Sequence, residues 1–251
     1  MSNGKKIKAI IEEEFIETKL QNDTKTTTSR RMDPNDRLYN TGFDRGIDFS
    51  DIKAALMMSY EETLGKINGL DENTKSYNSN ERKLTNRLIY ILVSMIQLLN
   101  GSRISEACKS FDMFIKNGTF DGKVLVKLSK SETTKYTDDG KEYKTKVRYR
   151  KIIFPIKWLE NPVDKKDLLK IIKPYLEKID KDILRKRVLD YLRKYHQCNT
   201  HSLRYAYINY MIYVQKNEPS LIAKHVGHSN LNQLIRYTQN KQADKLFDID
   251  I

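Results

Sequence analysis

Apolar residues recur at helical spacing along much of the chain, and polar stretches separate the helices that this spacing predicts. The first clear helix follows an N-cap at Ser50 and runs through Ile67. One face of it carries the recurring positions Ile52, Leu56, Ser59, Thr63 and Ile67. Residues 68–80 are polar and predict a break, after which a second helix spans about 81–99. Because the later half of that helix is apolar on most sides, we expect it at the centre of the core.

A strand pattern follows, with an alternating segment at 124–128 and a second at 147–155. The residues between them are rich in Thr, Lys, Asp and Gly, so the pair predicts a hairpin with a long basic loop. Further helices are expected to begin near Lys165, Asp180, His201, Ser220 and Asn230, with Pro174 and Pro219 near helix starts. The predicted fold class is α+β, mainly α, with a small antiparallel sheet.

The first 45 residues differ from the rest. Residues 5–19 have a helical period surrounded by charge, which predicts a marginal helix, and 21–45 are polar and read as a linker or flexible arm. We therefore place a domain boundary near Gly46, with an N-terminal arm at 1–45 and a single domain with a short tail at 46–251.

The net charge of the chain indicates what class of binding partner it has. The chain has 46 Lys and Arg against 33 Asp and Glu, a net charge of +13, which favours a polyanion. Between positions 123 and 157, eleven Lys and Arg stand against four Asp and Glu, so the basic surface is localised to the predicted hairpin. A hydrophobic content of 39% is enough for a packed core.

Two further observations concern the compartment. Cys108 and Cys198 are far apart and form no C-x-x-C pattern, which is typical of a reducing compartment. No stretch approaches the roughly 20 apolar residues of a membrane span. We expect an intracellular protein of the cytoplasm, nucleoid or nucleus that is neither secreted nor embedded in a membrane.

Three short motifs carry the candidate chemistry. Residues 101–106 read Gly-Ser-Arg-Ile-Ser-Glu, 201–204 read His-Ser-Leu-Arg, and 226–229 read Val-Gly-His-Ser, with Tyr237 nine residues after His228. Planar guanidinium groups match phosphate oxygens with bidentate hydrogen bonds, so Arg103 and Arg204 form a candidate phosphate clamp. A tyrosine beside such a clamp is a candidate nucleophile.

In these motifs the chain resembles the catalytic domain of the tyrosine recombinase (phage integrase) family. The family has an Arg in a G-x-R-x-S-E turn, a Lys in a hairpin, H-x-L-R, L-G-H-S and a nucleophilic Tyr, and each element occurs here in that order. The resemblance spans about residues 50–240 and implies a mainly helical catalytic domain with a small antiparallel sheet.

The resemblance also implies roles for individual residues. Tyr237 would attack the phosphorus, Arg103 and Arg204 would hold the phosphate, and His228 would add a further donor to it. A phenol with a pKa near 10 needs roughly 4 kcal/mol of assistance at pH 7, and His201 is the expected helper. Glu106 would orient its neighbours rather than react.

The proton for the leaving 5′ oxygen would come from a lysine of the hairpin. Lys130 ends the first predicted strand, where the lysine of the family falls. Lys135 is the alternative, because the loop is long and rich in lysine.

The implied activity is cleavage and rejoining of double-stranded DNA through a 3′-phosphotyrosyl link, with no metal, nucleotide or other cofactor. The fourteen residues after Tyr237 carry apolar positions among three Asp, and we expect this tail to join protomers into a homo-oligomer on DNA. The 45 residues before Gly46 are too few for the core-binding domain usual in the family, so the arm, the hairpin and a partner subunit would supply the grip on DNA. Heavy use of Lys, Ile, Asn and Tyr hints at a virus or another mobile element.

Other interpretations remain open. A type IB topoisomerase would share the fold and most of the site, although those enzymes usually have Lys in place of His201. A DNA-binding protein on the same fold without turnover is a second alternative. A zinc site is a third, since all four histidines, His196, His201, His225 and His228, lie within 33 residues alongside Cys198.

Overall fold

The computed structural model describes residues 47–71, 73–118, 120, 122–128, 134–136, 142–144, 147–159, 165–176 and 180–228. All of them belong to the unit that runs from Asp44 to Ile251. The expectations for residues 1–45, for a helix from Asn230 and for the tail lie outside the described residues.

The first described helix, α3 (Phe49–Asn68), has its N-cap at Asp48, two residues before the predicted cap. Oδ1 of Asp48 accepts the backbone N–H of Ser50 at 2.6 Å and that of Asp51 at 3.3 Å. The prediction of Ser50 as N-cap is therefore wrong, because the Asp48 carboxylate already satisfies these donors and Ser50 is helical. The buried face is also shifted from the predicted one and comprises Ile52, Leu56, Tyr60, Thr63 and Leu64.

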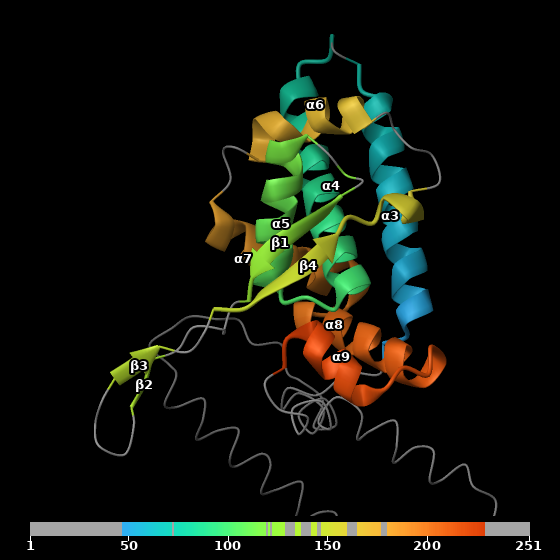
Figure 1. Ribbon diagram of the computed structural model, residues 1–251. Helices are drawn as coiled ribbons and strands as arrows, with labels where there is room; N and C mark the ends of the chain where they lie inside the picture. Colours follow the sequence, from blue (N-terminus) through green and yellow to red (C-terminus); the bar gives the residue numbers. More distant parts are fainter. Residues whose placement is uncertain are drawn as a thin grey trace, which may run out of the picture. The chain divides into compact units, whose positions relative to one another are not determined.

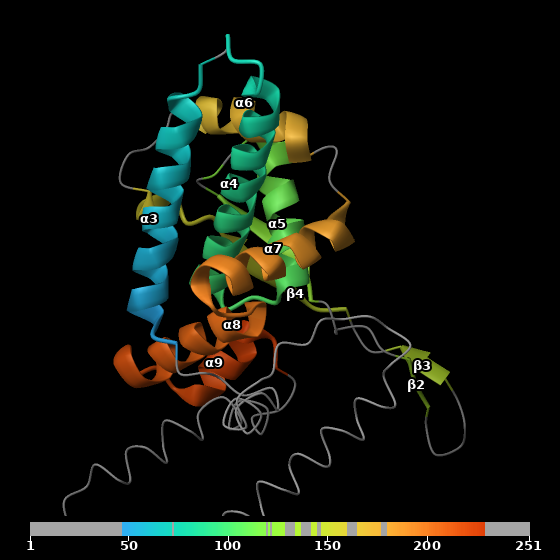
Figure 2. The ribbon, with the colours of Figure 1, turned by 180° about the vertical axis from the view of Figure 1, so that it is seen from behind.

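The helix α4 (Tyr77–Asn100) forms the centre of the core, as predicted, although it begins four residues earlier than expected. Its second half is buried almost without interruption from Leu88 to Leu98. It contacts α3, α5, α6, α7, α8 and β4, and α3 lies alongside it in both views of the ribbon (Figures 1 and 2). An all-round apolar helix requires such a surround, because every face of it must be removed from water.

The helix α5 (Ile104–Asn117) follows α4 after a turn of three residues and has no counterpart among the predicted elements. Its buried face contains Ala107, Phe111 and Phe114, which recur at helical spacing. The side chain of Glu106 is buried in its first turn.

The predicted hairpin is present and forms two short antiparallel sheets. The strands β1 (Lys123–Lys127) and β4 (Tyr149–Ile153) pair antiparallel, with Val124 opposite Ile152 and Val126 opposite Arg150. Within the connection, β2 (Thr134–Tyr136) pairs with β3 (Glu142–Lys144) as a second antiparallel sheet. The loop predicted between the two strands therefore contains a short hairpin of its own.

The remaining elements are mainly helical. They are the 3₁₀ turn η1 (Ile156–Trp158), α6 (Lys165–Leu176), α7 (Lys181–His196), α8 (Thr200–Asn209), the π-helical turn η2 (Tyr210–Val214) and α9 (Pro219–Val226). The predicted starts near Lys165, Asp180, His201 and Ser220 agree with these bounds to within one residue.

The predictions for the two prolines near helix starts have different outcomes. Pro219 occupies the first turn of α9, as predicted. Pro174 lies inside α6, two residues before its end, so its placement near a helix start is wrong. In the last turn the missing N–H removes one helical hydrogen bond without interrupting a long helix.

These elements confirm the fold class, which is mainly helical with a small antiparallel sheet. Within the described residues, no single helix is long and apolar enough to cross a membrane, and α4 with α5 passes that test only as a pair bent by 114°.

Gly101, which ends α4, provides a test of this packing. Its φ is +55°, and a Cβ there would lie 2.2 Å from Cδ1 of the buried Tyr207 ring. Gly101→Ala should lower the free energy of unfolding by roughly 2 to 5 kcal/mol, since left-handed strain costs about 1 to 2 kcal/mol and overpacking about 1 to 3 kcal/mol. Urea denaturation with an unchanged m-value measures this loss.

The matched control for that substitution is Gly65→Ala in α3, where nothing lies within 4 Å of the added Cβ. There the change should raise stability by about 0.5 to 1 kcal/mol, because Gly is unfavourable inside a helix. Equal effects of the two substitutions would contradict the role assigned to Gly101.

Candidate active site

Arg103 is presented by the turn between α4 and α5, and that turn is fixed from α4. Gly101 takes the left-handed conformation that ends α4, and the next residue, Ser102, is buried. Nε2 of the buried Gln97 donates to the carbonyl of Ser102 at 3.1 Å and to that of Thr200 at 2.7 Å. One amide therefore ties the Arg103 turn to the start of α8, where the His-Ser-Leu-Arg motif begins.

The buried carboxylate of Glu106 holds Arg103 and a second arginine. It accepts the backbone N–H of Arg103 at 3.2 Å and its Nη1 at 3.1 Å. On its other side, Nη1 of Arg150 lies 3.5 Å from Oε2. The side chain of Arg103 is 22% exposed, whereas those of Glu106 and Arg150 are inside the protein. Arg103 thus has one edge on a buried anion and another toward solvent.

Arg204 lies on α8 with only 2% of its surface exposed. Its Nη1 donates to the carbonyl of Gly101 at 2.6 Å and its Nη2 to that of Val226 at 2.8 Å. These carbonyls stand at the C-terminal ends of α4 and α9, where the helix dipole adds negative charge. A guanidinium held this way is preorganised, because its orientation is set before any phosphate arrives.

His228 follows α9 directly and is buried beside the two arginines. Its backbone N–H donates to the carbonyl of Ala223 at 2.8 Å. Burial, together with the positive charges of Arg204 and Arg103, lowers the pKa of His228 to about 4. The imidazole is therefore neutral at pH 7, and an anionic phosphate bound beside it would raise this pKa.

The structure thus brings Arg103, Arg204 and His228 together. His201 is exposed in the first turn of α8, three residues before Arg204 and on the same side of the helix. Lys130 and Tyr237 lie outside the described residues, and of Lys135 only the backbone in β2 is described. The roles of all six site residues stay predictions.

Arg150 is the residue of this cluster that the sequence analysis missed. Nη2 of Arg150 donates to the carbonyl of Asn100. The side chain of Asn100 in turn pairs with the backbone of Ile153, its Oδ1 accepting the N–H at 3.0 Å and its Nδ2 donating to the carbonyl at 2.9 Å. Arg150 and Asn100 therefore both join the end of α4 to β4.

Electrostatics distinguish Arg150 from a surface arginine. Its pKa is lowered to about 10 by burial and by the neighbouring Arg204 and Arg103, against the opposing effect of Glu106. A signal for it did exist in the sequence, because Arg150 shares its alternation phase with the inward-facing Ile152 and Phe154. A charged residue in the inward phase of a strand requires a buried partner.

The zinc interpretation finds no support in the geometry. Among the described residues, which include all four histidines and both cysteines, no group of three or more His, Cys, Asp or Glu is placed to hold a metal ion. Nε2 of His196 lies 3.1 Å from the hydroxyl of Tyr191 instead. Burial raises the pKa of the Cys198 thiol to about 12, which disfavours the thiolate that binds zinc.

Several known proteins resemble this chain in sequence, although no family model matches it. "Putative integrase V10" of Sputnik virophage is 42% identical over 210 residues, which cover 82% of this chain and 89% of that protein. "Putative integrase ORF241" of Acidianus two-tailed virus is 28% identical over 203 residues, covering 80% and 66%. "Uncharacterized protein MJ0770" of Methanocaldococcus jannaschii is 26% identical over 223 residues, covering 81% and 86%.

Among solved structures, the integrase of transposon Tn1549 is similar in two complexes. One is with a circular intermediate DNA, at 15% identity over 74% of this chain and 63% of that chain. The other is with transposon right end DNA, at 14% identity over 82% and 90%. The TM-score is 0.30 in both, which is too low to carry an inference.

The 42% identity over most of both chains defines the class of protein as an integrase. The chain belongs to the tyrosine recombinase (integrase) family.

The shared carboxylate gives a stability prediction. Arg150→Met should lower the free energy of unfolding by about 3 kcal/mol. The substitution removes one of the two arginines that pair with the buried Glu106 and leaves Arg103 as the other. Adding Glu106→Gln should recover part of that loss, since the uncompensated charge is then gone. Arg148→Met, at an exposed position two residues earlier, is the control and should change stability by less than about 0.5 kcal/mol. Chemical denaturation of the four proteins decides, and a double variant less stable than Arg150→Met would contradict the pairing.

Proposed function

We propose that the protein is a site-specific DNA recombinase that cleaves and rejoins double-stranded DNA through a 3′-phosphotyrosyl intermediate at Tyr237. The observation that carries this proposal is the convergence of Arg103, Arg204 and His228 on the turn after α4, in a chain of the integrase family. Two cations and a neutral imidazole at one place fit a phosphodiester, whose single charge is spread over two non-bridging oxygens.

The phosphate would bind at the solvent-facing edge of Arg103. That side chain is 22% exposed and is held from behind by Glu106. When a phosphate oxygen arrives, Arg103 can turn donors toward it while Arg150 remains beside the carboxylate. Arg150 therefore serves as a positioning residue, since it keeps Glu106 paired during the exchange. Charge that grows on the pentacoordinate phosphorus would then meet donors already in place.

The chemical step replaces one phosphorus–oxygen bond with another and moves two protons. The Tyr237 oxygen forms a bond to phosphorus as the bond to the 5′ oxygen breaks, and the phenolic proton passes to His201, the exposed base one turn before Arg204. A lysine of the hairpin, Lys130 or in second place Lys135, protonates the departing 5′ oxygen. Attack by another 5′ hydroxyl reverses these steps and rejoins the strand. This scheme calls for no metal ion or nucleotide cofactor.

Recombination needs two DNA sites in one complex, so the active protein would be a homo-oligomer on DNA. Residues 238–251 supply the proposed contact, with apolar positions among Asp244, Asp248 and Asp250. The basic segment at positions 123–157, which contains β1, β4 and their connection, would face the DNA, because its lysines and arginines exceed its acids eleven to four. The protein would act in the compartment that holds its DNA target, the cytoplasm, nucleoid or nucleus.

The nucleophile is tested with a suicide substrate, a nicked duplex that traps the covalent complex. Tyr237→Phe removes a single oxygen, so the fold and DNA affinity should persist while covalent adducts fall to background. Denaturing gels measure the adduct, and mass spectrometry identifies the attached residue. Adducts that persist in Tyr237→Phe, carried by another tyrosine such as Tyr213, would disprove the assignment. Relaxation of supercoiled DNA without exchange between two sites would instead indicate a topoisomerase.

The general acid is tested with a substrate whose bridging 5′ oxygen is replaced by sulfur, which departs without a proton. Lys130→Ala should cut the ordinary substrate at least a hundredfold more slowly, in the range of general acid catalysis, and recover with the sulfur substrate. Arg103→Ala should not recover, because its loss concerns phosphate charge rather than the leaving group. Rescue of Lys135→Ala in place of Lys130→Ala would move the role to Lys135.

A further inference from the structure

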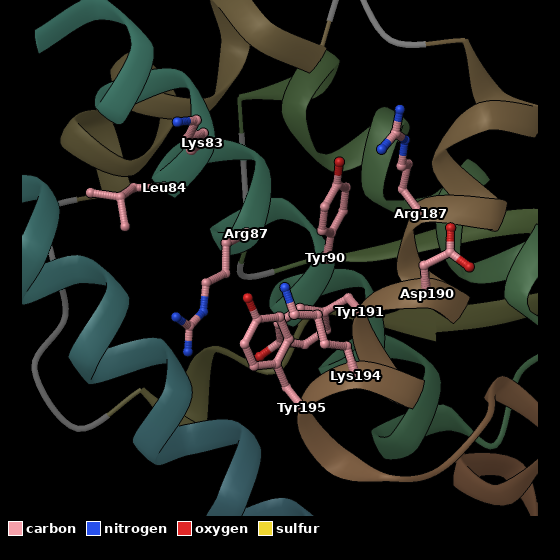
Figure 3. A pocket seen from close by; sticks show the side chains of 9 residues that line it. All are labelled: Lys83, Leu84, Arg87, Tyr90, Arg187, Asp190, Tyr191, Lys194 and Tyr195. Carbon is pink, nitrogen blue, oxygen red and sulfur yellow. The ribbon is translucent and has the colours of Figure 1, made fainter. Parts of the chain in front are cut away.

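A second basic site lies between α4 and α7, away from the proposed active site. It is a pocket of about 380 Å³, within the range of ligand sites, and Figure 3 shows the side chains around it. Its lining is Lys83, Leu84, Arg87, Tyr90, Arg187, Asp190, Tyr191, Lys194 and Tyr195.

This lining shares no residue with the proposed active site. The last α4 residue in it is Tyr90, and Gly101 follows eleven positions later. At the rise of an α-helix this separation is roughly 16 Å along the axis, so one phosphate cannot occupy both places.

The charges of the lining favour an anion. Four side chains are cationic, Lys83, Arg87, Arg187 and Lys194, and one, Asp190, is anionic. Glu62 of α3 lies 3.3 Å from Nη2 of Arg87 and offsets part of its charge. With Glu62 counted, four cations still face two acids.

Three tyrosines give the pocket an aromatic wall. The ring centroids of Tyr90 and Tyr191 are 6.3 Å apart, and those of Tyr191 and Tyr195 are 5.1 Å apart. Cζ of Arg87 lies 4.8 Å from the centroid of Tyr195 and Nζ of Lys194 lies 5.1 Å from it. Tyr191 is only 4% exposed, whereas Tyr195 is 48% exposed, so the ring of Tyr195 is the one accessible to a ligand.

The positions of the cationic and aromatic residues along α7 bear on which ligand fits the pocket. Arg187 and Lys194 lie on one face of α7 at helical spacing, and Tyr195, whose ring is exposed, directly follows Lys194. A nucleotide within a strand offers a flat base with a phosphate on either side, which suits two cations beside an exposed ring. Its base can face a tyrosine ring only when it is unpaired, because in a duplex both faces are stacked within the helix.

We propose that this pocket binds one nucleotide of single-stranded DNA, with the base against Tyr195 and the flanking phosphates at Arg187 and Lys194. The proposal rests on the proposed function only for the choice of DNA as the polymer. An acidic peptide would meet the cations, but its carboxylates offer no flat base to stack on the exposed ring of Tyr195.

The test is photocrosslinking of the full chain to a short single-stranded oligonucleotide that carries 5-iododeoxyuridine, followed by mass spectrometry of the attached peptide. Crosslinks are expected at Tyr195. Arg187→Gln should reduce their yield roughly fivefold or more at a subsaturating concentration, which is comparable to losing one base–aromatic contact. Arg185→Gln is the matched control, because Arg185 lies on the same helix outside the lining and pairs with Asp182 at 2.6 Å. Circular dichroism checks that each variant is folded.

Three outcomes would overturn the proposal. They are crosslinks confined to residues outside the lining, equal yields from Arg187→Gln and Arg185→Gln, and displacement by a duplex or an acidic peptide as efficient as by unlabelled single-stranded DNA. Failure of the proposed function is separable, because Tyr237→Phe should lose the covalent adduct on nicked duplex and keep the crosslink at the pocket.

Discussion

The buried carboxylate of Glu106 is the constraint on which the proposed active site depends. A carboxylate without water is stable only when cations and N–H groups replace its hydration, and here Arg103 supplies both a backbone N–H and a guanidinium. Arg150 approaches from the other side on β4. One charge thereby connects the start of α5 with β4, and Arg150 extends this connection to the end of α4. Removing the carboxylate would leave two arginines in mutual repulsion.

The same cluster explains why the site is poised for an anion. Burial and the nearby Arg204 and Arg103 lower the pKa of Arg150, while Glu106 and, to a lesser extent, Tyr207 oppose this shift. The lowered pKa of His228 follows from this excess of positive charge as well as from burial. A bound phosphodiester would relieve the repulsion among the arginines, so the electrostatic cost of assembling the empty site becomes a gain in affinity for the substrate.

Much of this arrangement follows from the sequence. The apolar second half of α4 predicts a central helix, because a side chain pattern without a polar face has no stable position at a surface. The motifs around Arg103, Arg204 and His228 were predicted as one site, and the structure brings these three residues together. Spacing in a motif is informative here because Arg103 and His228 lie beside helix ends, where one turn sets their direction, and because Arg204 lies on a helix that begins directly before its motif.

The rest depends on contacts that local patterns do not contain. The cap at Asp48 and the shifted face of α3 are decided by which carboxylate reaches the first N–H groups and by how α3 packs on α4. The helix α5 is absent from the predicted elements, although Ala107, Phe111 and Phe114 recur at helical spacing directly after the motif at 101–106. Arg150 was missed because its partners, Asn100 and Glu106, are 50 and 44 positions away in the chain.

The last turn of α4 links more of the domain than its length suggests. Gln97 reaches α8, Asn100 reaches β4, and the carbonyl of Gly101 receives Arg204. Opening this turn would break three anchors to two other elements, α8 and β4, at once, so it has no partial unfolding of low energy. Arg103 and Arg204 are therefore held in a rigid frame. In the proposed mechanism, control over when a strand is cut would then act on what is brought to this frame, the substrate, the lysine and the tyrosine, and not on the frame itself.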